Sequence, residues 1–176
     1  YDPENPSQHI IDMSENEIEV PEDYTREELR QDLLCYTSPV LKEDLVLTGD
    51  MTAELYISSD APDTDFVVRV TDVDENGRSI KLADGLLSAR YRNGFARSEF
   101  LQEGEIVCLK IRTTKLSNCF RKGHRIRVTV TSSAKNFIFP NSNTREGFAS
   151  ARTVVAHNRV YHGGLHASRL TVRVEP

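Results

Sequence analysis

The sequence has 176 residues and carries 22 Lys and Arg against 27 Asp and Glu, a formal net charge of −5. A nucleic-acid-binding surface needs an excess of Lys and Arg in one patch, and here charges of both signs are interspersed, so we exclude nucleic acid as a partner. The sequence contains no run of 18 apolar residues and no basic-then-apolar signal pattern, so no membrane-spanning or membrane-targeting segment is predicted.

Chain length and cysteine content predict one domain that folds without cross-links. A chain of this size buries on the order of 70% of its unfolded surface, enough for a hydrophobic core that needs no disulfide, metal or cofactor. The cysteines Cys35, Cys108 and Cys119 are odd in number, and each lies in or beside an apolar stretch. We therefore expect buried free thiols and, with them, a reducing, cytoplasmic location.

Residues 1–24 are typical of an extended arm or linker, with three prolines and many acidic groups but no periodicity. The apolar residues that could anchor this arm are Ile10, Ile11, Ile18 and Val20. We expect the arm to connect a sandwich domain, residues 25–176, to a catalytic domain elsewhere in a longer protein. Thr25 and Glu28 have the spacing of a capping box, which predicts one helical turn over residues 26–30.

From Leu33 onward the apolar residues recur with a period of two, typical of strands with one buried face. The clearest alternations are Met51, Ala53, Leu55 and Ile57, and Ile126, Val128 and Val130. Further β-branched runs cover residues 65–73, 86–92, 105–111, 153–161 and 168–174. About seven or eight strands with almost no helix predict an all-β sandwich or barrel.

Two connections between these strands have distinctive sequences. Asn76-Gly77 separates two of the runs and predicts a hairpin turn with positive φ at its central residues. Residues 132–151 lack strand periodicity and predict a large surface loop. The loop carries Phe137, Ile138, Phe139 and Phe148. Because exposed aromatic loops usually dock on another surface, we expect this one to do so.

The sequence offers no catalytic residue. An α/β-type serine esterase needs its nucleophile in a G-x-S-x-G elbow between a strand and a helix, and no serine here has those flanking glycines. The cysteines are no better as nucleophiles, because apolar burial raises a thiol pKa and no basic group is placed to offset that rise.

Three sets of Asp, Asn or His residues resemble metal sites, but the sequence favours a structural role for each of them. Asp72, Asp74, Asn76 and Gly77 reproduce the start of a calcium loop, but its twelfth position would be Ala83 instead of a glutamate, so an acidic hairpin turn is favoured. His157, His162 and His166 are separated by Gly163-Gly164, which prevents a helix from presenting them together. Asp60, Asp63 and Asp65 favour a turn with aspartate caps over a cation site, and Arg90 and Arg92 are possible ionic partners for them.

Carbohydrate binding is the main alternative function, because many all-β sandwiches bind sugars on exposed aromatic platforms. The chain has no Trp. Tyr and Phe can replace it, so an independent carbohydrate-binding module stays open as a hypothesis.

Several motifs, in order along the chain, resemble one domain family. They are residues 60–66 (DAPDTDF), residues 84–92 (DGLLSARYR), Ser117-Asn118 with Phe120, Gly123-His124-Arg125-Ile126-Arg127-Val128 leading into Ser132-Ser133, and more loosely Tyr1-Asp2-Pro3, Arg30-Gln31-Asp32 and Tyr36-Thr37-Ser38. Together they resemble the C-terminal domain of the X-Pro dipeptidyl-peptidase, cocaine-esterase and glutaryl-acylase-like hydrolases. The chain departs from the family pattern at Ser7-Gln8-His9, where Gly-Gly is usual, and at His166-Ala167-Ser168.

The resemblance implies a jelly-roll, galactose-binding-like sandwich that packs on an α/β-hydrolase domain and shapes its substrate entrance. The Ser, Asp and His of the catalytic triad would then lie in that other domain, and the accessory domain could also support a homo-oligomer. The sequence leaves peptidase, esterase and acylase chemistry open for the whole protein, and an autonomous enzyme is the third hypothesis. The residues that we expect at the domain interface are Phe137, Phe139, Asn143, His124 and Arg125.

Overall fold

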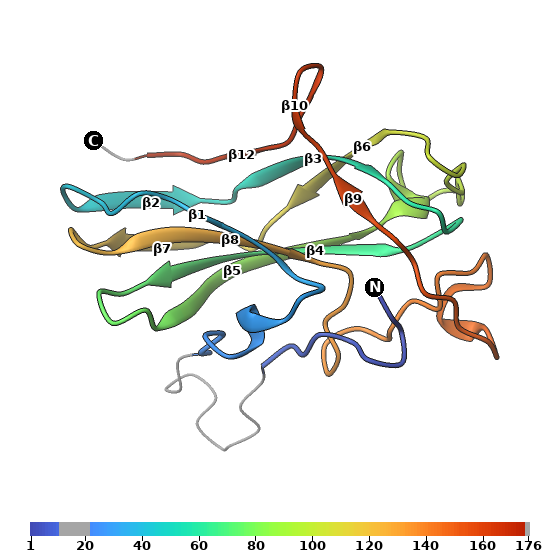
Figure 1. The fold of residues 1–176 in the computed structure, drawn as a ribbon. Coiled ribbons are helices and arrows are strands. Elements are labelled where there is room, and N and C mark those ends of the chain that lie inside the picture. Colours follow the sequence, from blue (N-terminus) through green and yellow to red (C-terminus); the bar gives the residue numbers. More distant parts are fainter. Residues whose placement is uncertain (11–21, 175–176) are drawn as a thin grey trace.

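The computed structural model describes residues 1–10 and 22–174, and they form a jelly-roll β-sandwich (Figure 1). One sheet has the antiparallel order β1 (Leu34–Thr37), β8 (Arg125–Thr131), β4 (Asp65–Val73) and β5 (Ser79–Ser88). The other contains β12 (Arg169–Thr171), β3 (Thr52–Ser58) and β6 (Val107–Arg112), with β9 (Arg159–Val160) also paired to β3. The all-β prediction is therefore confirmed.

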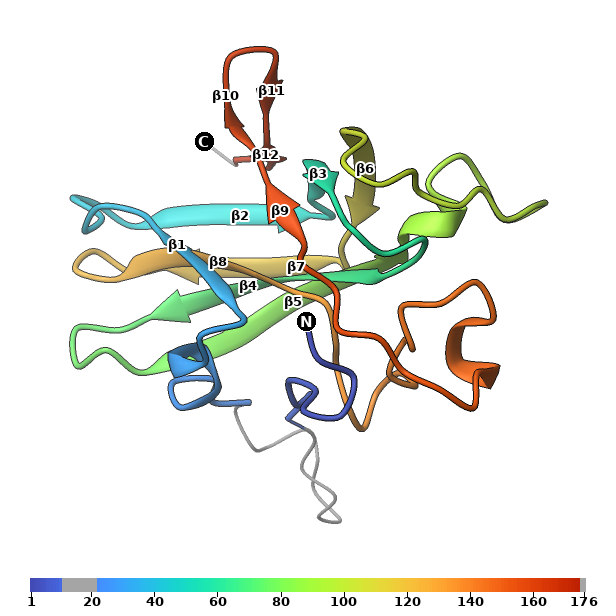
Figure 2. The same ribbon diagram turned by 45° about the vertical axis from the view of Figure 1, so that its right-hand side comes forward.

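Shorter elements complete the fold. β2 (Leu45–Gly49) pairs with β7 (Leu116–Phe120), and β10 (His162–Gly163) pairs with β11 (His166–Ala167) in a hairpin that projects from the sandwich (Figure 2). The described helical elements are three 3₁₀ turns: η1 (Glu27–Leu29), η2 (Ala89–Tyr91) and η3 (Gly147–Ala149). None of the described residues forms a helix long and apolar enough to cross a membrane.

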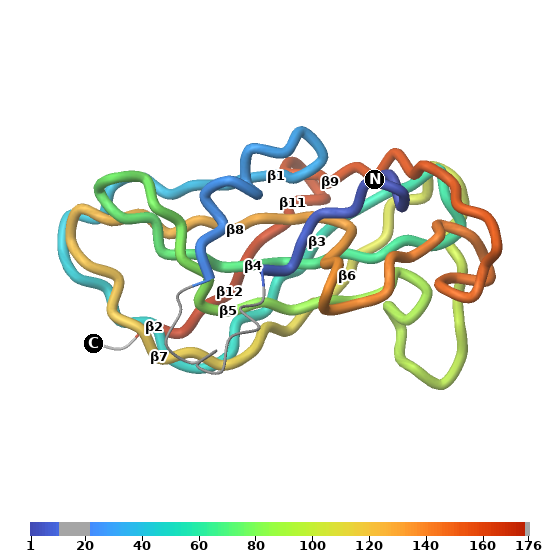
Figure 3. The backbone as a smooth tube through the Cα atoms, turned by 90° about the horizontal axis from the view of Figure 1, so that it is seen from below, coloured from blue at the N-terminus to red at the C-terminus, as the bar shows by residue number. Residues whose placement is uncertain are grey.

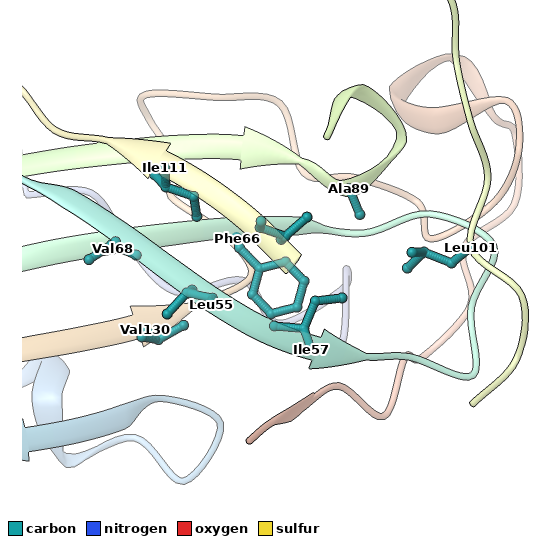
Figure 4. Packing of buried hydrophobic residues seen from close by; sticks show 10 residues of the cluster. Leu55, Ile57, Phe66, Val68, Ala89, Leu101, Ile111 and Val130 are labelled. Carbon is teal, nitrogen blue, oxygen red and sulfur yellow. The ribbon is translucent and has the colours of Figure 1, made fainter. Parts of the chain in front are cut away.

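The core lies between the two sheets, where the predicted alternation places apolar side chains. Ala53, Leu55 and Ile57 of β3 face Phe66 and other inward residues of β4, with Val130 of β8 beside them (Figure 4). A second cluster around Leu47, Met51, Val70 and Phe120 fills the other end of the sandwich. Each fully buried side chain of this size contributes about 1.5–3 kcal/mol, so these two clusters are a main source of the stability of the sandwich.

Residues 1–10 and 22–24 of the N-terminal arm lie across the outer face of the β1-β8-β4-β5 sheet (Figure 3). Backbone N–H groups attach it: Ser7 donates to Ser133 Oγ (2.8 Å), His9 to the Lys135 carbonyl (2.8 Å) and Tyr24 to the Ser79 carbonyl (2.8 Å). Because of this cover, the outward side chain of Arg69 is as buried as the core. The predicted anchors Ile11, Ile18 and Val20 lie outside the described residues.

The capping-box prediction is wrong, although a short helical turn does form at η1. Arg26 is the N-cap residue and makes no side-chain cap bond, while Thr25 bonds Asp23 instead. Glu28 turns inward beneath the arm, where it accepts hydrogen bonds from Arg127 Nη1 (2.5 Å) and Ser79 Oγ (2.9 Å). A buried carboxylate is stabilised far more by these charged and hydroxyl donors than by one backbone cap.

The prediction of buried thiols is wrong for Cys35, which is exposed on the edge strand β1, and Cys108 and Cys119 are only partly buried. Strand β1 lies at the edge of its sheet, and all four of its residues, the apolar ones included, are exposed.

Two predicted strands are shorter in the structure, and one predicted turn differs in its backbone conformation. The run 86–92 is not a strand throughout, since β5 ends at Ser88 and η2 follows. The run 153–161 contains only the two-residue β9. The Asn76-Gly77 hairpin is confirmed, but only Gly77 has positive φ (84°), because Asp74 Oδ1 accepts the amides of Asn76 and Arg78 and closes a longer turn.

Candidate domain interface

The most exposed aromatic pair of the long loop lies at one end of the sandwich. Phe139 and Phe148 are 78% and 74% exposed, and their rings stack on each other with centroids 5.8 Å apart. Two large apolar side chains held together in water lose little additional entropy on binding, which favours contact with another surface.

A buried polar cluster fixes the backbone beneath this pair. Asp63 is fully buried and accepts from Arg90 Nε (2.7 Å), while Arg90 Nη2 donates to the Thr144 carbonyl (3.0 Å). Asn141 Nδ2 donates to Asp63 (2.7 Å) and to Asp65 (2.9 Å). The cluster therefore ties the long loop to the ends of β4 and β5.

The electrostatics of the two aspartates in this cluster differ. Burial raises the pKa of the Asp65 carboxyl, and the nearby Asp63 carboxylate raises it further, against hydrogen bonds that lower it. Asp63, by contrast, has the guanidinium of Arg90 in direct contact. The expected pairing of Arg90 with this aspartate cluster is present, whereas Arg92 donates to the carbonyls of Ala89 and Glu99.

The predicted interface residues of the long loop do not all face outward. Asn143 is fully buried, with φ of 62°, and its Nδ2 donates to the Val154 carbonyl (2.6 Å). It shapes the loop from inside and cannot itself touch a partner surface. Phe137 is half-exposed but stacks on His9 of the arm, with ring centroids 4.6 Å apart, so part of its surface is already used within the chain.

His124 and Arg125 lie at the opposite end of the sandwich from the long loop. Arg125 is opposite Val73 in the β4–β8 register, whereas the loop begins after Thr131, which is opposite Val67. Six residues of strand separate the two ends by about 20 Å. His124 bonds Asp72 (2.9 Å) and Arg125 bonds the Ser38 carbonyl (3.0 Å), so both side chains stabilise this chain's own turns. The predicted interface set therefore divides into two distant groups.

His157 makes a structural contact with Asp60. His157 Nδ1 lies 2.7 Å from Asp60 Oδ2, and its backbone N–H donates to Asp60 Oδ1 (2.8 Å). Burial opposes ionisation of Asp60, but these two bonds outweigh it and lower the pKa of the carboxyl. Ser58 lies in the same hollow but bonds the Tyr161 hydroxyl (2.9 Å) instead of the imidazole.

The Asp60, Asp63 and Asp65 cluster was predicted to cap its own turn. Asp60 instead caps the distant segment that contains His157. Among residues 1–10 and 22–174, no group of three or more His, Cys, Asp or Glu side chains is arranged to hold a metal ion.

Sequence reasoning missed two further exposed apolar side chains, Phe95 and Leu165. Phe95 packs its ring against Tyr91 (5.6 Å), and Leu165 is at the tip of the β10–β11 hairpin. The Gly163-Gly164 pair before Leu165 was a turn signal that could have revealed the hairpin.

The described residues thus form a jelly-roll β-sandwich domain with an exposed, stacked aromatic pair at one end. Residues 3–171 match the family described as the X-Pro dipeptidyl-peptidase C-terminal non-catalytic domain. The chain belongs to that family.

Similar proteins agree with this assignment. Cocaine esterase of Rhodococcus sp. (strain MB1 Bresler) is 37% identical over 150 residues, which are 82% of this chain and 26% of that protein. The chain thus spans about a quarter of that relative's length. Two crystal structures share the fold: an aminopeptidase from a marine sediment archaeon, Thaumarchaeota archaeon (TM-score 0.91, 24% identity, 99% of this chain and 32% of that one), and an alpha-amino acid ester hydrolase (TM-score 0.85, 23% identity, 99% and 31%).

Proposed function

We propose that this chain is the accessory domain of a serine hydrolase that cleaves ester or amide bonds, and that it packs on the α/β-hydrolase domain and shapes its substrate entrance. The family assignment supports an accessory role, and the similarity to a cocaine esterase and an alpha-amino acid ester hydrolase supports the reaction class. The proposed packing on that domain is supported by one observation, the stacked and exposed pair Phe139 and Phe148.

The chemistry of that pair fits a protein surface. A contact with another domain removes both rings from water, and burial of such side chains contributes about 1.5–3 kcal/mol each. The polar cluster around Asp63 and Arg90 holds the loop in place before contact, so little additional order is needed when the domains meet.

The test is a Phe139→Ser, Phe148→Ser double variant of the longer protein that contains this domain. We expect a lower melting temperature and weaker ester hydrolysis than in the parent, because the domain contact is lost. Leu29→Ser is the matched control, since Leu29 is equally exposed on η1 and belongs to another part of the surface.

Two results would count against the proposal. If the double variant keeps the parent's stability and activity, the aromatic pair does not form the interface. If the isolated chain binds a simple sugar saturably and the double variant abolishes that binding, the chain is an independent carbohydrate-binding module.

A further inference from the structure

The sandwich has an uncovered edge between β1 and β9. Two adjoining hollows of about 250 and 260 Å³ open there, and both are lined by Val130 and Val160. Their floors reach the core residues Phe66 and Leu55. We call these two hollows together the edge groove.

The inward side of β1 shows that this edge lacks a cover. Leu34 and Tyr36 share the face that lines the edge groove, yet they are 42% and 37% exposed. Cys35 and Thr37 point the other way, toward Glu28 and Arg127. Core-facing residues of a strand are normally buried by an opposing element, so one more segment is required here.

Tyr1 lies at the mouth of the edge groove, and its pairing with Ala156 gives the direction in which the backbone runs there. The terminal amino group of Tyr1 donates to the Ala156 carbonyl (2.6 Å) and the Ala156 N–H donates to the Tyr1 carbonyl (2.9 Å), the reciprocal pattern of an antiparallel pair. Thr153 Oγ1 also donates to Glu4 Oε1 (2.9 Å), a second contact between the same two segments. Figure 2 shows the N-terminus beside the segment that enters β9.

From these observations we infer that the residues immediately before Tyr1 in the longer hydrolase add a strand antiparallel to residues 157–160 and cover the edge groove. This inference rests on the proposed attachment to a catalytic domain. In the register of Tyr1 with Ala156, the second residue before Tyr1 is opposite Asn158 and the fourth is opposite Val160. Four residues extend about 13 Å, enough to reach the far hollow.

The facing of the side chains follows from the same register. Ala156, Asn158 and Val160 line the edge groove and are buried or half-buried, whereas His157, at the rim of the same hollow, and Arg159 are exposed. The second and fourth residues before Tyr1 therefore point into the groove, and the first and third point to solvent.

The groove also contains polar atoms that this strand can satisfy. The Tyr1 hydroxyl and Asn158 Oδ1 are buried and have no hydrogen-bond partner among the described residues. An inserted segment brings hydrogen-bond donors to Asn158 Oδ1. Without a donor, this buried acceptor stays unpaired, which lowers the stability of the fold. A continuous peptide is favoured over a free ligand because it is covalently held at the mouth of the groove.

The test is a disulfide trap in the longer protein. Cysteine replaces the third residue before Tyr1 and is combined with Arg159→Cys, its predicted partner in a non-hydrogen-bonded pair, where Cβ atoms are about 4.5–5.5 Å apart. The control combines the same cysteine with His157→Cys, which is on the same exposed face but two residues out of register. Peptide mass mapping separates the new cross-link from any that involves Cys35, Cys108 or Cys119.

We expect the cross-link with Arg159→Cys and its loss with His157→Cys. Equal yields, or a cross-link only in the control, overturn the proposed register. Hydrogen exchange of the unmodified longer protein gives an independent readout: the amides of Asn158 and of the second residue before Tyr1 should be protected, and fast exchange at both overturns the inference.

The two proposals fail separately in this design. A longer protein that hydrolyses esters but forms no register-specific cross-link refutes the added strand and leaves the accessory function standing. A longer protein that forms the cross-link but has no hydrolase activity refutes the accessory function and leaves the strand standing.

Discussion

Asp63 and Arg90 form a buried ion pair, with 2.7 Å between Oδ2 and Nε, and the same aspartate also accepts the Arg90 backbone N–H (3.0 Å). Asp63→Asn leaves the guanidinium without its counter-charge, and we expect a loss of about 3–5 kcal/mol in the free energy of unfolding. Chemical denaturation at neutral pH measures this loss.

Asp65→Asn is the matched control for that experiment. Burial raises the pKa of Asp65, so its charge costs stability, and an asparagine keeps the oxygen that Asn141 requires. We expect an unchanged or slightly higher free energy of unfolding. Equal losses at the two positions would contradict the different roles assigned to them.

His9 should make the attachment of the arm dependent on pH. Burial lowers the pKa of its imidazole, the nearby Lys81 lowers it further, and Asp84 partly opposes both. Because the folded-state pKa lies below the unfolded value of about 6.5, the neutral ring stabilises the fold fully above that pH, and this contribution is lost as the pH falls through the folded pKa.

Hydrogen exchange at His9 and Ile10, whose amides bond the Lys135 carbonyl and the Tyr24 hydroxyl, checks this. Protection, corrected for intrinsic exchange, should be constant above about pH 6.5 and fall as the pH is lowered below it. His9→Gln should remove that change. Protection that stays constant in the parent would exclude His9 as the titrating group.

Phe137 and Phe139 should differ in their effect on this chain, although they are two residues apart. Phe137→Ser removes the ring that stacks on His9, and we expect a loss of about 1 kcal/mol in the free energy of unfolding. Phe139→Ser should change it by less than about 0.5 kcal/mol, because that ring is exposed. Thermal unfolding of both variants measures the two losses in stability, and equal losses would contradict the predicted difference.

Gly85 allows a close approach between β5 and the end of β6. A Cβ at this position would clash with the Arg112 carbonyl oxygen, a backbone atom that cannot move aside cheaply. We expect Gly85→Ala to cost about 1–3 kcal/mol in the free energy of unfolding. Gly163→Ala is the control, because its Cβ would meet no atom within 4 Å, and an equal loss there would refute the steric explanation.

Strand periodicity predicted the core well because burial is local to each strand. Ala53, Leu55 and Ile57 alternate in sequence and all face the opposite sheet. Arg69 and Thr71 also alternate with apolar residues, which predicts exposed positions, but both are buried beneath the arm. That burial depends on a segment some 60 positions away, outside the reach of any local pattern.

The candidate site was only partly predictable for the same reason. The phenylalanines of the long loop stood out by composition, whereas the positions of Asn143 and His124 depend on how distant segments meet. Asn143 is enclosed because Val154 folds back over it. His124 lies at the far end because the register of β8 on β4 places it there.

The most direct test of the accessory role is hydrolysis of a chromogenic acyl ester and an X-Pro chromogenic amide by this chain and by the longer protein. We expect turnover only in the longer protein, and the substrate that it cleaves will distinguish esterase from peptidase chemistry. Turnover by this chain alone, surviving repurification, would contradict the accessory role and show that a catalytic site lies within these 176 residues.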